Sequence, residues 1–273
     1  LSTQEVLQIV RLVESYVFRR AICAIPTNSQ NKTFASLSRT LKKNRYLESV
    51  QAALLLLPSY RRFPSDEEFQ REIKVRDLYK FRSRSYWLRR FENHGRKERV
   101  VVEDYTVEHI LPQNEPLSPE WQAELGSDWQ RVQQEWLHTL GNLTLTGYNS
   151  EYSDRPFIYK RDQVTDKDGH PVGFAHSPLR LNQGLAQVQH WNEAAIKARA
   201  HRLAAEAVKV WPAPRLAADV LSAYRPAAAK AGQSYGVADH PHLATGPVRV
   251  LFEELRKAIL ALDACVSEEF LKF

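Results

Sequence analysis

Two short stretches with β-strand character interrupt a chain whose remaining pattern is helical. The first, Val107 to Leu111, lies within TVEHILPQ and ends at Pro112, and the second is NLTLT, from Asn142 to Thr146. Short apolar or alternating runs of this kind are typical of strands. A third run, Val100 to Val102, has the same character. The sequence therefore predicts a mainly α-helical domain that encloses a very small sheet.

Helical periodicity predicts the other elements. Apolar residues recur at helical spacing from Ser2 to Ile25, where Ser2 and Glu5 form a capping-box pattern. Further helices are expected over residues 32–43, 47–57, 65–76, 77–93, 118–125, 129–140, 156–164 and 192–210, and from residue 247 onward.

Composition divides the chain into four regions. We expect a helical region at 1–95 and a central region with the predicted strands and flanking helices at 96–212. Residues 213–240 are rich in Ala, Pro and Gly and read as a linker. Residues 241–273 are expected to be the start of a truncated C-terminal helical module. The chain contains no Met, even at position 1, which indicates a fragment of a longer protein.

Composition also restricts the class of protein. With 43% hydrophobic and 26% charged residues, the chain fits a soluble globular protein. The longest aliphatic block, AALLLLP from Ala52, is too short to span a membrane, and the first residues lack the pattern of a signal peptide. Two cysteines, Cys23 and Cys265, are too few for a disulfide framework. We therefore expect a cytoplasmic protein without membrane partners.

The net charge of +6 is unevenly distributed. Residues 71–99 carry many basic side chains with aromatic residues between them, which suits a surface that follows a phosphate backbone. The alternative is a solvated amphipathic helix whose aromatic residues belong to the core. The basic residues are Arg71, Lys74, Arg76, Lys80, Arg82, Arg84, Arg89, Arg90, Arg96, Lys97 and Arg99.

Polar residues cluster around the two predicted strands. Glu108 and His109 lie at the end of the first strand, Asn142 begins the second, and Asn149 follows it. A basic helix with Arg155, Lys160 and Arg161 comes next. This order of strand, loop, strand and helix is typical of a ββα-metal nuclease site. The alternative is a solvent-facing Glu108 beside a hydrogen-bonded core histidine.

Phosphodiester hydrolysis explains these residue types. An imidazole has a pKa suited to taking a proton from water near neutral pH. Mg²⁺ or Mn²⁺ stabilises the additional charge on the phosphate, and a carboxylate with an amide oxygen are suitable ligands for it. Glu108 and Asn149 supply those oxygens, and the cations of the following helix are placed to hold substrate phosphates.

The stretches VEHILPQN and LHTLGNLTLTGYNSEYSDRPFIYKR resemble the HNH-type (His-Me finger) nuclease domain at the C-terminus of GmrSD-type modification-dependent restriction proteins. The SspE-like effectors that act with DNA phosphorothioation share that domain. The flanking stretches LVESYVFRRAICAIPTNSQNKTF, YWLRRFEN and WNEAAIKARAHRLAAEAVKVWP extend the resemblance to residues 1–212. It implies an HNH-type nuclease core at 96–212.

The resemblance also implies residue roles. His109 is the general base, Glu108 a metal ligand, Asn142 the residue that orders the loop around the base, and Asn149 a second metal-side residue. Arg89, Arg90, Arg155, Lys160 and Arg161 are the expected DNA contacts. Many HNH nucleases have Asp where this chain has Glu108, and many HNH domains carry a zinc knuckle of four cysteines that this chain lacks.

Other histidines have weaker patterns. His138 precedes Gly141 and Asn142 and either approaches the site or, as the favoured interpretation, interacts with a helix dipole. The remaining ones lack ligand-like spacing: His170, His176, His190 and His201, together with the linker residues His240 and His242.

The expected function is a metal-dependent DNA endonuclease, either a nickase or a double-strand cleaving enzyme, in a bacterial antiviral restriction system that responds to DNA modification. The expected partners are phage or modified double-stranded DNA and an N-terminal nucleotide-dependent sensing domain of the parent protein. A non-catalytic DNA-binding module of the same fold and an RNA-cleaving nuclease are the alternatives.

Overall fold

The computed structural model describes residues 1–81, 84–225, 237, 243 and 245–261. The chain divides into one compact unit at residues 1–218 and a second unit at 219–273. The predicted boundaries at residues 95 and 212 remain predictions. Arg82, Cys265, His240, His242, much of the predicted linker and part of the predicted C-terminal module lie outside the described residues.

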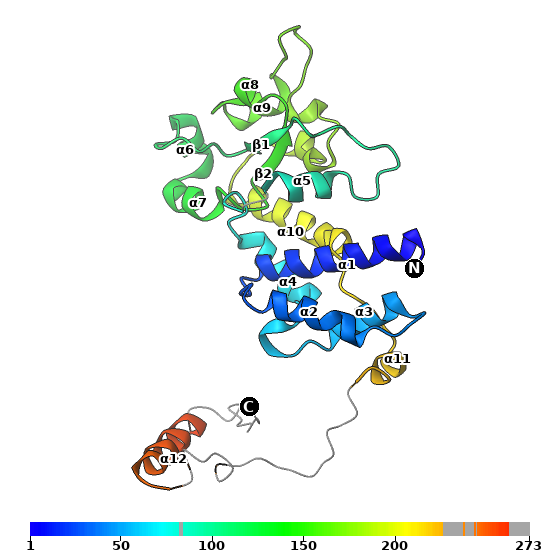
Figure 1. Ribbon diagram of the computed structural model, residues 1–273. Coiled ribbons are helices and arrows are strands. Elements are labelled where there is room, and N and C mark those ends of the chain that lie inside the picture. Colours follow the sequence, from blue (N-terminus) through cyan, green and yellow to red (C-terminus); the bar gives the residue numbers. More distant parts are fainter. Residues whose placement is uncertain (82–83, 226–236, 238–242, 244, 262–273) are drawn as a thin grey trace. The chain divides into compact units, whose positions relative to one another are not determined.

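The described elements are mostly helical, as predicted (Figure 1). No helix among them is both long enough and apolar enough to cross a membrane. The strands are β1 (Thr106–His109) and β2 (Leu143–Thr146). The helices are α1 (Thr3–Ile22), α2 (Gln30–Thr40), α3 (Tyr46–Leu55), η1 (Ser59–Arg61), α4 (Asp66–Val75), α5 (Arg84–Glu92), α6 (Pro119–Leu125), α7 (Trp129–Trp136), α8 (Asn149–Tyr152), α9 (Phe157–Asp162), η2 (Phe174–His176), η3 (Arg180–Asn182), η4 (Leu185–Gln187), α10 (Glu193–Val210), α11 (Ala218–Ser222) and α12 (Pro247–Leu260).

Helix boundaries follow the predicted local signals. At the start of α1, Ser2 and Glu5 form the capping box, because each side chain bonds the backbone N–H of the other residue. The side chain of Asn192 likewise caps α10, since its Oδ1 accepts from the Ala195 N–H at 3.1 Å. These side chains satisfy backbone donors that the first helical turn leaves without an intrahelical partner.

The two strands pair antiparallel, with Thr106 opposite Thr146 and His109 opposite Leu143. Figure 1 shows them between α5 on one side and α8 with α9 on the other. A two-stranded sheet has too little apolar surface of its own to be stable, so it depends on the packed helices. All four residues of β2 are buried, which agrees with cover on both faces.

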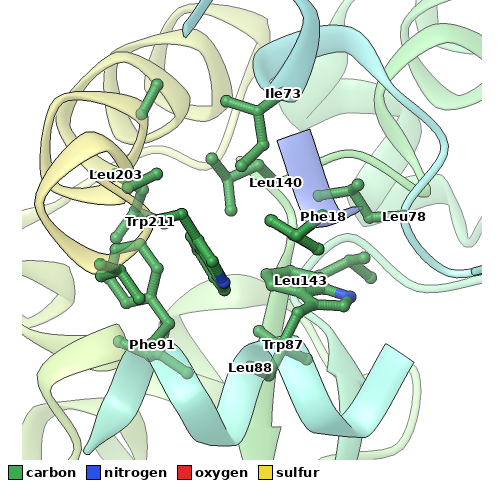
Figure 2. Packing of buried hydrophobic residues seen from close by; sticks show 14 of the residues in the cluster. Phe18, Ile73, Leu78, Trp87, Leu88, Phe91, Leu140, Leu143, Leu203 and Trp211 are labelled. Atoms are coloured by element: carbon green, nitrogen blue, oxygen red, sulfur yellow. The ribbon is translucent and has the colours of Figure 1, made fainter. Parts of the chain in front are cut away.

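One hydrophobic cluster joins the N-terminal helices to the sheet. Phe18 of α1, Trp87 of α5, Leu143 of β2 and Leu203 of α10 belong to it, and Trp211 is fully buried among them (Figure 2). The rings of Phe18 and Trp211 stack with centroids 4.1 Å apart. Helices α1, α5 and α10 therefore hold the sheet from segments nearly 200 residues apart.

Two element predictions are wrong. The basic helix expected over 77–93 is not helical at residues 77–81, because Arg76 is extended and Leu78 N–H donates to the carbonyl of His138 at 2.8 Å, and α5 covers Arg84–Glu92. The run Val100–Val102 is not a strand. Val102 nevertheless belongs to the hydrophobic cluster and Val100 packs against it, whereas Val101 is exposed.

Candidate active site

His109 ends β1 and is only 4% exposed. Its Nε2 lies 3.0 Å from Nδ1 of His138, which is within hydrogen-bonding distance. The ring of Tyr79 contacts both imidazoles: it meets His109 edge-on with centroids 4.5 Å apart and stacks on His138 at 5.1 Å. These three rings, Tyr79, His109 and His138, form what we term the histidine cluster.

The role favoured for His138 from the sequence is wrong. Helix α7 ends at Trp136, and the His138 side chain points to His109 instead of serving a helix end. Burial lowers the pKa of His138, the charge of Asp77 opposes this shift, and Lys80 adds to it. The structure thus adds to the candidate site a second imidazole that spacing alone did not assign.

Glu108 makes a buried ion pair with Lys160 of α9. The Lys160 ammonium is fully buried and lies 2.7 Å from Glu108 Oε1, and it also donates to the carbonyl oxygens of His109 and Ile110 at 3.0 and 3.2 Å. Three acceptors match the three N–H bonds of an ammonium. The prediction that Lys160 contacts DNA is therefore wrong, because its charge is used inside the protein.

Burial affects both members of this pair. It raises the pKa of the Glu108 carboxyl, while the Lys160 ammonium and a backbone hydrogen bond from His109 act in the opposite direction. It lowers the pKa of Lys160, and Glu108 opposes that shift. Mutual attraction of this kind is what keeps two such groups charged in a low-dielectric interior.

Adjacent side chains on a strand point to opposite faces. Glu108 accordingly faces Lys160 of α9, whereas His109 faces Tyr79 and His138. The alternative interpretation of the sequence placed Glu108 in solvent. That interpretation is wrong, because Glu108 is only 6% exposed. Glu108 and His109 therefore lie in different environments, although they are adjacent in the sequence.

Asn142 orders the segment between the strands' ends. Its Oδ1 accepts from the N–H of Leu111 at 2.7 Å and from Trp191 Nε1 at 3.1 Å. Its Nδ2 donates to the carbonyl oxygens of Leu111 and Leu137 at 3.0 and 2.9 Å. The side chain is fully buried, so these contacts fit the loop-ordering role expected of it and exclude direct contact with a substrate.

Arg199 of α10 was not predicted to take part in the site region. Its Nη1 donates to the carbonyl oxygens of Leu140, Gly141 and Leu143 at 3.1, 2.7 and 3.0 Å, and its Nη2 donates to that of Leu181. Burial lowers its pKa to about 9. We regard the group as charged, because four carbonyl dipoles stabilise the guanidinium. It fixes the backbone on either side of Asn142.

Asn149 begins α8, next to the N-terminal half of β1. Its Nδ2 donates to Thr106 Oγ1 and to the carbonyl oxygen of Val107, the latter at 3.3 Å. Its Oδ1 is buried and accepts no hydrogen bond within the described part of the chain. Thr106 and Glu108 share a face of β1, so Asn149 lies on the Glu108 side and not beside His109.

The predicted DNA contacts on α5 are engaged within the chain. Arg89 Nη2 donates to the carbonyl oxygens of Glu103 and Tyr105. Arg90 Nε is 3.0 Å from Glu14 Oε1 of α1. Both guanidinium groups therefore have partners within the chain, and Arg90 is paired with a carboxylate of another helix.

Arg161 and Arg155, the two remaining residues predicted to contact DNA, differ in whether their charge is paired within the chain. Arg161 is paired with Asp162 and donates to the carbonyl oxygen of Val188. Arg155 is exposed, and its guanidinium lies 5.0 Å from the ring centroid of Tyr159. It lines an open cavity of about 430 Å³, together with residues of α8 and Thr165.

Asp166, Asp168 and His170 form a second group of potential ligands. One ligand atom from each lies within 4.8 Å of the others. The sequence signal is D-K-D-G-H, although His170 was expected to lack ligand-like spacing. The Asp166 carboxylate already accepts the backbone N–H groups of Asp168 and His170, so this arrangement also stabilises the turn itself.

The comparisons with known proteins agree with the sequence resemblance. The family model described as "GmrSD restriction endonucleases, C-terminal domain" matches residues 63–206. This range starts before α4 and ends within α10, and it contains both strands and the histidine cluster. No curated protein and no solved structure gave a significant match.

Proposed function

The chain belongs to the family of GmrSD restriction endonuclease C-terminal domains, and from that premise we propose that it is a metal-dependent DNA endonuclease domain. The observation that carries the proposal is His109 at the end of β1, inside the matched range and hydrogen-bonded to His138. A histidine held in one orientation by a neighbouring group is suited to accept a proton from water. His109 is therefore the proposed general base.

The chain's other residues support the geometry around that base. Lys160 binds the carbonyl oxygens of His109 and Ile110, and Asn142 bonds both backbone groups of Leu111. Three consecutive residues at the end of β1 are thus held by side chains from distant segments. Such support keeps a catalytic group within the narrow range of positions in which it is effective.

The divalent ion is proposed on the donor chemistry of Asn149. An amide oxygen that is buried without a hydrogen-bond donor suits a hard cation, and Asn149 Oδ1 has this property. Glu108 lies on the same face of β1, but it already binds Lys160, so a metal would have to share its carboxylate. When bound, Mg²⁺ or Mn²⁺ would stabilise negative charge on the phosphate.

A second candidate is a non-catalytic DNA-binding module. The observation that favours it is the separation of His109 from Asn149: they lie at opposite ends of β1 and on opposite faces, and His109 is only 4% exposed. A phosphodiesterase site brings base and cation to one phosphate. The two candidates share the fold and differ only in turnover.

Supercoiled plasmid DNA incubated with the chain separates the candidates. We expect nicked or linear product with Mg²⁺ or Mn²⁺ and none with excess EDTA. His109→Asn, which preserves a polar side chain in the buried position, should slow cleavage by about 100-fold or more without weakening DNA binding. His201→Asn, on the exposed part of α10, is the matched control.

Turnover in EDTA, or an unchanged rate in His109→Asn, would overturn the metal or the base assignment respectively. DNA binding without any cleavage would identify the non-catalytic module. A parallel incubation with RNA tests the third class, since an RNA-cleaving nuclease would degrade RNA and leave the plasmid intact.

The wider context is part of the same proposal. Within a longer protein, this domain would act in antiviral restriction, with recognition of DNA modification, including phosphorothioation, assigned to a nucleotide-dependent domain that precedes it. A fusion of that domain to this chain should make cleavage depend on the modification and on nucleotide. Equal cleavage of modified and unmodified plasmids by the fusion would contradict this arrangement.

A further inference from the structure

We propose that a cavity next to Asn149 binds the nucleobase of an unpaired or extruded nucleotide in the DNA substrate. The cavity has a volume of about 160 Å³, and we term it the tyrosine cavity. On one side it is lined by Tyr105 and Leu145, which pack in the hydrophobic cluster of Figure 2. On the other side it is lined by Tyr148 and Tyr152, which pack in a second buried cluster. The inference rests on the proposed function, because it requires a DNA substrate.

The inner wall of the tyrosine cavity is apolar and its rim is open. Leu145 is fully buried, and Tyr152 and Leu179 are 1% and 3% exposed. Gly147 and His176 also line the cavity and are exposed, so it is accessible from solvent. An empty void inside a protein is typically closed and apolar. The tyrosine cavity has neither property, and it is therefore a candidate binding site.

The lining of the cavity suits a flat heterocycle and not a phosphate. None of the described residues that line it is Lys or Arg, so the positive charge that a phosphate requires is missing. Tyr105 and Tyr148 instead provide aromatic rings, on which bases of any sequence can stack. The volume is below the range of pockets for drug-sized ligands, which begins at about 300 Å³. A single nucleobase without its sugar is a ligand of the smaller size.

Polar groups are available for the edge of a base. The hydroxyl oxygen of Ser177, in the cavity wall, accepts from the Leu179 N–H at 3.3 Å and from Asn182 Nδ2 at 2.8 Å. These two bonds leave the Ser177 hydroxyl hydrogen to donate. The hydroxyl groups of Tyr105 and Tyr148 have no hydrogen-bond partner among the described residues. Stacking together with hydrogen bonds to the edge is the way in which proteins bind an extruded base.

The position of the cavity fits a nucleotide at the candidate active site. Tyr148 directly precedes Asn149, the residue on which the divalent ion is proposed, and Tyr152 ends α8. Other residues of α8 line the open cavity that contains Arg155. A single helical turn thus lies between a place for a base and an exposed arginine, the residue type that binds backbone phosphates. One nucleotide carries both groups.

A preference for unpaired nucleotides is the measurable consequence. Extrusion of a base costs pairing and stacking energy, and this cost is lowest where the base has no partner. In EDTA, which prevents metal-dependent cleavage, fluorescence anisotropy compares a fully paired duplex with the same duplex carrying one unpaired nucleotide. We expect the full chain to bind the second duplex about 10-fold more tightly, the effect of stacking one base on an aromatic side chain.

Four variants test whether the cavity causes this preference. Tyr148→Ala removes one wall, and Gly147→Val obstructs the cavity, because a Cβ at this position lies 3.4 Å from the ring of Tyr105. Both should bind the two duplexes equally. Tyr148→Phe retains the ring and should retain most of the preference. Tyr60→Ala, which removes an exposed tyrosine outside the cavity, is the matched control and should bind as the wild type does.

A photochemical crosslink locates the base directly. With 5-iododeoxyuridine as the unpaired nucleotide, irradiation joins the base to an aromatic side chain on which it stacks, and mass spectrometry of the peptides identifies that residue. We expect Tyr105 or Tyr148. Equal affinity of the wild type for the two duplexes, a preference that persists in Tyr148→Ala, or crosslinks only outside the cavity would each overturn the inference.

The outcomes also separate this inference from the proposed function. Cleavage of plasmid DNA with Mg²⁺ but no preference for the unpaired nucleotide would remove the base site alone. A preference and a crosslink in the cavity without any cleavage would establish the base site and remove the proposed catalysis.

Discussion

Lys160 Nζ lies 2.7 Å from Glu108 Oε1, and this buried contact joins α9 to the strand that carries His109. The two residues are 52 positions apart, and neither side chain is more than 8% exposed. The same ammonium binds the carbonyl oxygens of His109 and Ile110. The contact is therefore both an ion pair and a support for the backbone at the candidate active site.

Removing one partner of this pair should destabilise the unit that comprises residues 1–218. Lys160→Met leaves the Glu108 carboxylate buried without its counter-ion, which typically costs about 3–5 kcal/mol. Urea unfolding at pH 7 measures the loss. Lys167→Met, at an exposed position, is the control and should change the free energy of unfolding by less than about 0.5 kcal/mol.

The double variant Lys160→Met/Glu108→Gln tests the cause. Because it removes both charges, it should regain a large part of the stability lost in Lys160→Met. A double variant as unstable as the single one would show that the hydrogen bonds to the His109 and Ile110 carbonyls, and not the unpaired charge, account for the loss.

The second prediction concerns Gly141, where a larger side chain should lower the free energy of unfolding. A Cβ at this position would lie 2.3 Å from the carbonyl oxygen of Ile196 and 2.8 Å from its Cγ2, and the backbone of α10 cannot move away locally. Gly141→Ala should therefore destabilise the fold by about 1–3 kcal/mol. Gly147→Ala is the matched control, since the nearest atom, on Tyr105, is at an ordinary 3.4 Å.

Thermal or urea unfolding of the two glycine variants gives the comparison. The control should be neutral, or more stable by up to about 1 kcal/mol, because alanine restricts the unfolded chain. Equal effects of the two substitutions would mean that the approach of α10 to Gly141 does not limit packing.

Local signals made much of the fold predictable. The capping box at Ser2 and Glu5 and the alternation of β2 are properties of neighbouring residues, and the structure confirms the elements they predicted. The failure over residues 77–81 has a non-local cause, because Leu78 N–H bonds to the carbonyl oxygen of His138 and not within a helix. Periodicity contains no information about a partner 60 residues away.

The candidate site was predictable only in part, for the same reason. His109 and Asn142 could be identified from the sequence, because a histidine and an asparagine are unusual residue types on short strands. The interior positions of Lys160 and Arg199 were not predictable, since charged residues on helices are normally exposed and become buried only when tertiary structure brings acceptors to them. His138 was misassigned because its partner, His109, lies 29 positions away.

Glu193 predicts an acid-dependent loss of stability. Hydrogen bonds from Arg131, and then from Lys197 and Trp136, lower the pKa of this carboxyl from its ordinary 4.5 to about 2. A carboxyl with a lowered pKa in the folded state stabilises the fold above its ordinary pKa and loses that contribution as the pH falls toward the lowered value. The contribution of Glu193 is thus present at pH 7 and disappears between pH 4.5 and 2.

Urea unfolding of the wild type and Glu193→Gln over this pH range provides the measurement. Their free energies of unfolding should differ at pH 7 and converge as the pH approaches 2. Glu98→Gln, at an exposed position, controls for the loss of one negative charge. A difference that stays constant with pH would attribute the effect of Glu193 to packing or neutral hydrogen bonds.

The last prediction concerns which arginines contact DNA. Arg155 is exposed beside the cavity next to α8, whereas Arg90 is paired with Glu14 across the α1–α5 contact. Each phosphate contact on duplex DNA contributes about 0.9 to the slope of log affinity against log salt concentration. Arg155→Ala should therefore weaken DNA binding and reduce the slope by about 0.9. Arg90→Ala should leave the slope unchanged and lower the free energy of unfolding by up to about 1 kcal/mol, the range of partly exposed ion pairs.

Fluorescence anisotropy at several salt concentrations distinguishes the two variants. Arg45→Ala, at an exposed position distant in sequence from both arginines, serves as the control for net charge. If Arg90→Ala reduces the slope while Arg155→Ala does not, the DNA path follows α5, and the Glu14 pair must open when DNA binds.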